Sequence, residues 1–128
     1  LQNGMMPVIA PLGVGDNGEI YNVNADLAAG AVAMALKAEK LVYLSDVEGI
    51  LVNNKLVSSL TRNEAQAFMK DGAIFGGMIP KVTSAFETLD ACVNKVHIID
   101  GRVKHSLLLE IFTDEGIGTQ MVHDEGLQ

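Results

Sequence analysis

Residues 41–49 read Leu-Val-Tyr-Leu-Ser-Asp-Val-Glu-Gly, an apolar run of strand length that ends in a polar turn. Continuous apolar runs of this length are typical of parallel strands whose two faces are covered by helices. Polar side chains that follow such a strand lie at the carboxyl edge of the sheet, where open α/β folds bind ligands. The stretch therefore predicts a buried strand that leads into a ligand-binding loop, although a turn held by local Asx hydrogen bonds explains the same residues.

The sequence on both sides of this strand predicts further short elements. Before it, residues 7–12 and 19–21 predict the strands of a hairpin, and residues from about 24 predict a closely packed helix capped by Asn24 or Asp26. After it, we expect a hairpin across Asn53-Asn54-Lys55 and a helix from a Thr61–Glu64 capping box to near Gly72. We then expect a helix with Pro80 in its first turn and an apolar stripe at Val82, Phe86, Leu89 and Val93. A buried strand at 96–99, a short helix at 106–110 and a strand near 119–122 are expected to follow. Alternating strands and helices predict an α/β fold, a three-layer αβα sandwich with a largely parallel central sheet, spanning residues 1–128 as one domain.

Composition excludes several classes of function. The net charge of -7 disfavours binding to nucleic acids and to anionic membrane surfaces, because both repel an acidic protein. No apolar run approaches the roughly 20 residues that span a bilayer, and the N-terminus lacks the order of a signal peptide. The single cysteine, Cys92, excludes an internal disulfide and favours a reducing compartment, and we expect its thiol to be buried. Because the chain opens at Leu1 and enters a strand-like run almost at once, we expect a piece of a longer chain.

Residues 13–18 match the pattern G-x-G-x-x-G that dinucleotide-binding folds use. In those folds a helix starts inside the motif, so that its N-terminus meets the pyrophosphate. Here a short strand is predicted after the motif, which favours a hairpin over a dinucleotide site. The sequence also lacks a Walker A motif, zinc-spaced cysteines and histidines, and the G-x-S-x-G pattern of a nucleophilic serine.

Two polar clusters are further candidates for chemistry. Residues 22–26, Asn-Val-Asn-Ala-Asp, place three short polar side chains between a strand and an apolar helix, and only one of them can be the helix cap. Residues 76–81, Gly-Gly-Met-Ile-Pro-Lys, place two glycines and a lysine at the start of another helix. The helix dipole disfavours a cation there unless an anion is shared, and backbone N–H groups, dipole and ammonium together suit a phosphate. The alternative is that Lys81 extends into solvent.

The order and spacing of three segments resemble the amino acid kinase family, and within it the C-terminal, nucleotide-binding lobe of the acetylglutamate kinases. The segments are residues 22–26, 41–49 and 76–81. The resemblance covers nearly the whole chain. It implies ATP- and Mg²⁺-dependent phosphorylation of the side-chain carboxylate of N-acetyl-L-glutamate in arginine biosynthesis, in the cytoplasm or in a plant plastid. Such a transfer rests on positioning and charge stabilisation, and an ionised carboxylate acceptor needs no general base. We therefore expect His97, His105 and His123 to be structural or surface residues.

The resemblance also implies roles at matching positions. Asp26 would orient the catalytic lysines, and Lys81 would neutralise charge on the transferred phosphoryl group. Asn22 and Asn24 would hold the acetylated amino acid, and no side chain is assigned as a metal ligand. The nucleotide would contact Ser45, Asp46, Val47, Glu48, Gly49, Ile50, Ala73, Ile74, Phe75, Gly76 and Gly77. Residues 110–119 resemble the ending of arginine-inhibited members, which implies that Glu110 and Gly116 lie where arginine binds.

The resemblance leaves out the N-terminal substrate lobe of the family, with its first glycine-rich loop, its second catalytic lysine and an arginine for the substrate. We therefore expect this chain alone to bind nucleotide at best and to show no useful turnover. Full-length members are expected to be homo-oligomers, and a nitrogen-signalling protein is a further candidate partner.

Three other interpretations stay open. Carbamate, glutamate and uridylate kinases share the architecture and differ chiefly in the acceptor pocket. A non-catalytic module that senses arginine, nucleotide or a partner protein is the second. The third is a fragment that only folds, whose exposed apolar face would lead to association.

Overall fold

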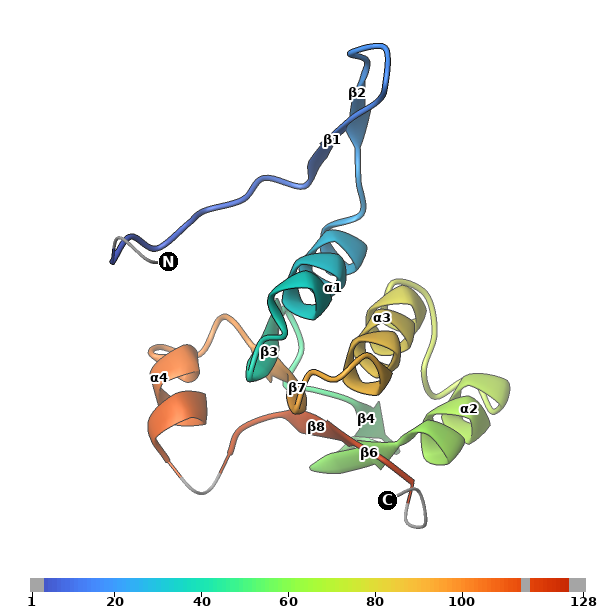
Figure 1. Ribbon diagram of the computed structural model, residues 1–128. Helices are drawn as coiled ribbons and strands as arrows, with labels where there is room; N and C mark the ends of the chain where they lie inside the picture. Colours follow the sequence, from blue (N-terminus) through green and yellow to red (C-terminus); the bar gives the residue numbers. More distant parts are fainter. Residues whose placement is uncertain (1–3, 114–115, 125–128) are drawn as a thin grey trace.

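The computed structural model describes residues 4–113 and 116–124 and is built around a four-stranded sheet (Figure 1). The strands follow the order β3 (Lys40–Ser45), β7 (Lys95–Asp100), β8 (Thr119–Val122) and β6 (Ser59–Thr61). The pairs β3–β7 and β6–β8 are parallel, and the central pair β7–β8 is antiparallel. The expected α/β fold with a largely parallel sheet is therefore confirmed.

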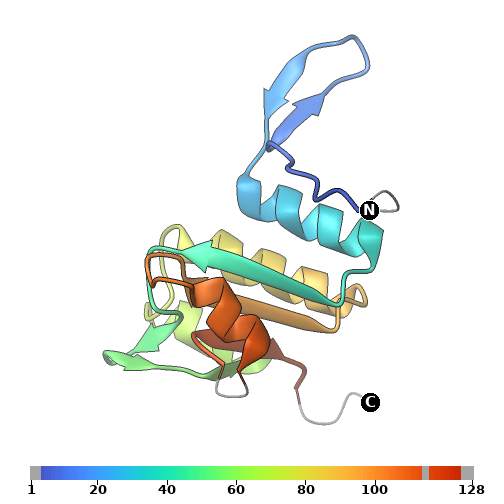
Figure 2. The same cartoon turned by 90° about the vertical axis from the view of Figure 1, so that its left-hand side faces the viewer.

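Helices lie on both faces of this sheet. They are α1 (Ala25–Leu36), α2 (Arg62–Lys70), α3 (Met78–Asp90) and α4 (Ser106–Phe112). Figures 1 and 2 show α1 and α3 on one side and the short α4 on the other. Successive residues of a strand point to opposite faces, and β7 illustrates the consequence: Ile98 belongs to the core beside α3, whereas His97 is paired with Glu110 of α4.

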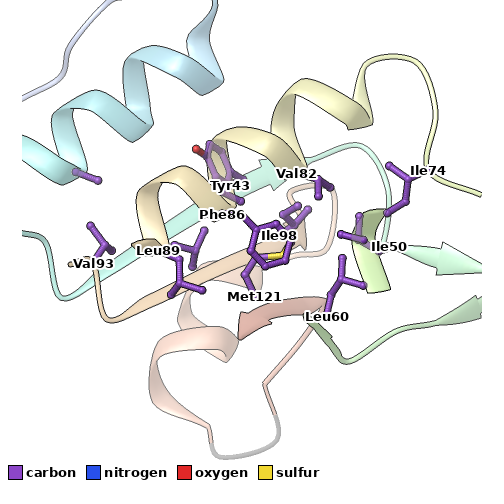
Figure 3. Close-up of a cluster of buried hydrophobic side chains, with 14 residues drawn as sticks. Tyr43, Ile50, Leu60, Ile74, Val82, Phe86, Leu89, Val93, Ile98 and Met121 are labelled. Atoms are coloured by element: carbon purple, nitrogen blue, oxygen red, sulfur yellow. The ribbon is translucent and has the colours of Figure 1, made fainter. Parts of the chain in front are cut away.

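The hydrophobic core lies between α3 and the sheet (Figure 3). The predicted stripe of α3 faces it, because Val82, Phe86 and Leu89 are all buried. Val93 is buried as well, although it lies beyond the end of the helix at Asp90. Burial of each such side chain stabilises the fold by about 1.5–3 kcal/mol, so that α3 is firmly fixed against the strands.

Two small hairpins complete the fold. β1 (Leu12–Val14) and β2 (Ile20–Asn22) are antiparallel and stand away from the sheet (Figures 1 and 2), which confirms the hairpin interpretation of the glycine motif. β4 (Leu51–Val52) and β5 (Lys55–Leu56) are joined by Asn53 and Asn54, whose φ angles of 52° and 60° suit a tight two-residue turn.

Two sequence predictions about the fold need correction. We expected a strand from residue 7, but β1 begins only at Leu12. Pro7 and Pro11 lack the backbone N–H that a strand ladder needs. We also expected Cys92 to be buried, but it is exposed, with a φ of 73°, in the turn after α3. The turn directs the next residue, Val93, into the core instead.

The helices within the described ranges are each too short or too polar to cross a membrane.

Candidate functional site

The two residues predicted to be catalytic lie in direct contact. Lys81 Nζ donates to Asp26 Oδ1 at 2.5 Å, and the contact joins the first turns of α3 and α1. The side chains are only 14% and 21% exposed, so that water screens the pair less than it would an ion pair at the surface. Lys81 therefore does not extend into solvent, and the carboxylate fixes the position of its ammonium group.

The asparagines beside Asp26 have different surroundings. The side-chain oxygen of Asn24 accepts hydrogen bonds from the backbone N–H groups of Asp26 and Leu27, at 3.0 and 3.1 Å, so that Asn24 is the cap of α1. Its amide nitrogen is the group left to face a ligand. Asn22 ends β2 and has an exposed side chain. The cap explains one of the three polar residues in this cluster, as the sequence required.

The start of α3 is open to an approaching ligand. Gly77 is the cap residue and supplies no side-chain hydrogen bond, and the first turn contains no acidic residue. Gly76 adopts a φ of 55°, a conformation that glycine takes without strain. A Cβ at Gly76 or Gly77 would meet open space. The positive end of the helix dipole and the Lys81 ammonium therefore adjoin a surface that a phosphate can reach.

A pocket of about 270 Å³ lies between the loop after β3 and the loop before α3. Six of the predicted nucleotide residues line it, namely Val47, Gly49, Ile50, Ala73, Ile74 and Phe75. Leu51 and Met78 complete the lining, and Met78 is the first residue of α3, three positions before Lys81. An apolar pocket of this kind suits a flat heterocycle. Two segments that are far apart in the sequence are thus brought together at one site.

The other predicted nucleotide residues do not line this pocket. Ser45 is half-buried at the end of β3, and Asp46 and Glu48 are exposed on the loop that follows. Gly76 and Gly77 lie beside the pocket, at the helix start. A larger hollow of about 380 Å³ between α1 and residues 7–11 contains none of the predicted site residues.

Thr119 anchors the pocket loop, a role that the sequence interpretation missed. Its hydroxyl accepts a hydrogen bond from Ile50 N at 2.8 Å and donates to the carbonyl oxygen of Val57 at 2.6 Å. Gly49, with a φ of 146°, packs so closely that a Cβ there would lie 2.7 Å from the same hydroxyl. One fully buried side chain of β8 therefore holds the loop that follows β3.

The sequence interpretation also missed an ion pair between Asp100 and Arg102, which lies at the same edge of the sheet. Arg102 binds both carboxylate oxygens of Asp100, at 2.9 and 2.8 Å, and its backbone N–H adds a third bond to the carboxylate. These hydrogen bonds hold the pKa of Asp100 at about 2. The next residue, Gly101, donates to the carbonyl oxygen of Ser45 at 2.8 Å. The pair thus orders the end of β7 beside the start of the pocket loop.

Glu110 and Gly116, predicted for arginine, lie together on the other face of the sheet. The Glu110 carboxylate is buried and contacts Lys40 Nζ at 2.5 Å and His97 Nδ1. Its second oxygen accepts from Ile117 N at 3.0 Å, and a Cβ at Gly116 would lie 3.6 Å from it. Burial lowers the pKa of His97, which the Glu110 charge only partly offsets. His97 therefore fits a neutral ring that donates from Nδ1.

The remaining histidines, His105 and His123, are exposed. Among the residues that the structure describes, no group of three or more histidine, cysteine or carboxylate side chains is placed to hold a metal ion. Such a group is not needed for Mg²⁺ that arrives with a nucleotide, because phosphate oxygens, waters and one or two carboxylates usually supply its ligands. The open glycines, Lys81 and the apolar pocket fit ATP.

Comparison with known proteins shows the family of this chain. Residues 1–100 match the model of the Amino acid kinase family. An acetylglutamate kinase of Pelodictyon phaeoclathratiforme (strain DSM 5477 / BU-1) is 57% identical over 122 residues, which is 95% of this chain but 40% of that protein. The chain thus spans about 40% of the length of the curated relatives it matches.

Solved structures share the fold. N-acetylglutamate synthase from Neisseria gonorrhoeae, complexed with coenzyme A and L-arginine, superposes with a TM-score of 0.82 at 36% identity, over 89% of this chain and 27% of that one. Carbamate kinase from Giardia lamblia, bound to AMP-PNP, superposes with a TM-score of 0.65 at 24% identity, over 88% of this chain and 41% of that one. On the match to the family model, the chain belongs to the amino acid kinase family.

Proposed function

We propose that this chain is the nucleotide-binding lobe of a cytoplasmic kinase that transfers the γ-phosphoryl group of ATP to the side-chain carboxylate of N-acetyl-L-glutamate. The observation that carries the proposal is the Asp26–Lys81 pair at the open start of α3, next to an apolar pocket. The identity of 57% to an acetylglutamate kinase supports the choice of substrate over the carbamate, glutamate and uridylate alternatives.

Each part of the site has a role in this reaction. The pocket holds the base, and the Gly76–Gly77 backbone lets the triphosphate approach the start of α3. Lys81 offsets the charge that spreads over the phosphoryl oxygens during transfer, and Asp26 keeps the ammonium group in place. Mg²⁺, when bound with the nucleotide, neutralises further charge on the phosphate oxygens.

The acceptor is a carboxylate of the substrate. One of its oxygens forms the bond to phosphorus while the bond from phosphorus to the bridging oxygen of ADP breaks, so that an acyl phosphate and ADP result. Because the carboxylate is already ionised at neutral pH, no base has to remove a proton. Asn22 and the amide group of Asn24 are proposed to hold the N-acetyl amino acid at the end of β2 and the start of α1.

Calorimetric titration with Mg²⁺ and a nonhydrolysable ATP analogue tests the nucleotide site. We expect Lys81→Ala to weaken binding by roughly tenfold or more, the value of a charge-assisted hydrogen bond. Lys104→Ala is the matched control, because Lys104 is exposed on the turn before α4. Equal affinities of the Lys81→Ala and Lys104→Ala chains would contradict the placement of the phosphates.

Turnover is proposed to require the substrate lobe as well. The chain has 40% of the length of an acetylglutamate kinase, and the second catalytic lysine that the family resemblance implies has no counterpart in it. A coupled ADP-release assay with N-acetyl-L-glutamate should therefore show no activity above the background. A Mg²⁺-dependent rate from this chain alone would contradict this part of the proposal.

Assembly of the full-length kinase into a homo-oligomer, and binding of a nitrogen-signalling protein, are proposed on the family resemblance alone.

A second proposal concerns the opposite face of the sheet, where we infer an inhibitory arginine site. The supporting observation is the buried Glu110 carboxylate with Gly116 beside it, together with a synthase relative that was solved with L-arginine. Titration with L-arginine should give binding that Glu110→Gln weakens, and D-arginine is the control ligand. Arginine binding by a chain that does not bind nucleotide would favour the sensor interpretation over the kinase.

A further inference from the structure

Two hydroxyl groups converge on the backbone carbonyl oxygen of Asp26. Ser84 Oγ donates to it at 3.1 Å, and Tyr43 Oη lies 3.2 Å from it. The two hydroxyls are themselves 3.0 Å apart. A carbonyl oxygen has two lone pairs, so that it can accept a bond from one of these hydroxyls in addition to one within the helix. The other hydroxyl can then bond to the first. The first turn of α1 is thereby tied to both β3 and α3.

The two helices approach each other closely at this point. Gly30 of α1 is buried, and a Cβ there would lie 2.7 Å from Thr88 Oγ1 and 2.8 Å from Ser84 Oγ. Thr88 Oγ1 donates to the carbonyl oxygen of Ser84 at 2.7 Å, so that this hydroxyl is already used within α3. The glycine thus lets the Ser84 hydroxyl reach α1.

Tyr43 also contacts the partner of Asp26. The Lys81 ammonium lies 5.1 Å from the centre of the Tyr43 ring, within the range of a cation–π interaction. Ser84 and Lys81 are three residues apart on α3, which places them on neighbouring positions of one helix face. In Figure 3 the Tyr43 oxygen points away from the core cluster, towards α1. Burial raises the pKa of Tyr43, which keeps its hydroxyl protonated at neutral pH.

We propose that Tyr43 and Ser84 are positioning residues for the catalytic lysine: their hydroxyls hold the first turn of α1, and with it the Asp26 carboxylate, while the Tyr43 ring supports the Lys81 ammonium. The inference rests on the proposed function, because Lys81 is assigned there to the phosphoryl group. The position of the Lys81 side chain can be measured without a nucleotide.

The test is competitive acetylation of the folded chain, in which the labelling rate of Lys81 is measured by mass spectrometry relative to that of exposed Lys104. Loss of the hydroxyl alone, in Tyr43→Phe or Ser84→Ala, should raise the relative rate about twofold to fivefold. Tyr43→Leu also removes the ring and should raise it further, to about tenfold. The order wild type, Tyr43→Phe, Tyr43→Leu is the expected result.

Two controls separate positioning from general stability. Leu89→Ala opens the core under the same helix, away from Lys81, and should lower the unfolding temperature without changing Lys81 labelling. Tyr21→Phe removes the hydroxyl of the other tyrosine, which bonds only Glu19 among the described residues, and should change nothing. If Tyr43→Leu does not fold, Tyr43→Phe and Ser84→Ala decide the question.

Unchanged Lys81 labelling in the folded Tyr43 and Ser84 variants, or a rise that Leu89→Ala reproduces, would overturn the inference. Titration of the same variants with the ATP analogue keeps the two proposals apart. A wild-type chain that binds no analogue but follows the expected labelling order contradicts the nucleotide site and supports the positioning role.

Discussion

The Lys81 ammonium and the Asp26 carboxylate are 2.5 Å apart, although 55 positions of sequence separate them. The contact links the first turns of two helices whose N-termini point to the same edge of the molecule. A carboxylate is favoured near a helix N-terminus and a lysine is not, so that the Asp26 charge compensates for the unfavourable placement of Lys81.

Adjacent residues in the loop before α3 should respond in opposite ways. Both side chains line the pocket, but Phe75 is 72% exposed, whereas Ile74 is 2% exposed and belongs to the core. Phe75→Ala should weaken binding of the ATP analogue by about tenfold, the value of a base stacked on an aromatic ring, and leave the unfolding free energy unchanged. Ile74→Ala should lower the unfolding free energy by about 2–5 kcal/mol. Denaturant unfolding and calorimetry on both variants check this, and a large stability loss in Phe75→Ala would contradict it.

A methyl group at Gly30 should destabilise the fold. Alanine favours helices by about 1 kcal/mol over glycine, but the added Cβ overlaps two hydroxyl oxygens of α3, and overpacking costs about 1–3 kcal/mol. We expect a net loss of up to about 2 kcal/mol in Gly30→Ala. In a double-mutant cycle with Thr88→Ala, which removes the nearest oxygen, the loss should shrink by about 0.5 kcal/mol or more. Strict additivity of the two changes would show that the helices do not meet here.

His97 should make the stability of the fold sensitive to mild acid. Its pKa in the folded state lies below the ordinary value of 6.5, chiefly because of burial, so that the unfolded chain binds the proton more readily. The unfolding free energy should therefore fall as the pH is lowered through the ordinary value of 6.5. His97→Gln should flatten this slope, and His105→Gln, at an exposed site, should keep it. Urea unfolding at several pH values makes the comparison.

The Asp100–Arg102 pair should be visible in a carboxyl titration. The folded pKa of Asp100, about 2, lies below the ordinary value of 3.8, so that the pair stabilises the fold above about pH 4 and loses this effect as the pH falls towards 2. Arg102→Ala should move the pKa of Asp100 up towards 3.8. Arg102→Lys should give an intermediate value, because lysine cannot bind both carboxylate oxygens in a planar fork. Carbon-detected NMR of the Asp100 carboxyl group measures this pKa in the wild type and in both variants. The same pKa in all three chains would argue against the pair.

Sequence patterns predicted the parts of the fold that local chemistry decides. The apolar run of β3, the Thr61–Glu64 capping box and the Asn53–Asn54 turn all have the predicted structure, because each depends on residues close together in the chain. The two loops that line the pocket were also predicted, although only the resemblance to a family joined them into one site. Whether they bind a nucleotide stays a prediction.

Contacts between distant elements were not predictable in the same way. Thr119, Tyr43 and Ser84 look like ordinary residues of a strand or a helix, and their hydroxyls acquire a role only when three elements meet. The burial of Cys92 was predicted wrongly because it was inferred from the residue type alone, whereas the direction of one turn decides which residue enters the core. A signal was available for Asp100 and Arg102, whose opposite charges flank a glycine at the end of a buried strand.

The order of the strands in the sheet also constrains how the chain folds as it is synthesised. β6 is made before α2, α3 and β7, yet its partner in the sheet is β8, which follows all of them in the sequence. Thr119, at the start of β8, also holds the pocket loop. Nearly all of the described residues must therefore leave the ribosome before β6 is paired with β8 and the pocket wall is fixed. Pairing over such a long sequence separation is slow. On the proposed function, a nucleotide would assist folding only after β8 has inserted between β7 and β6.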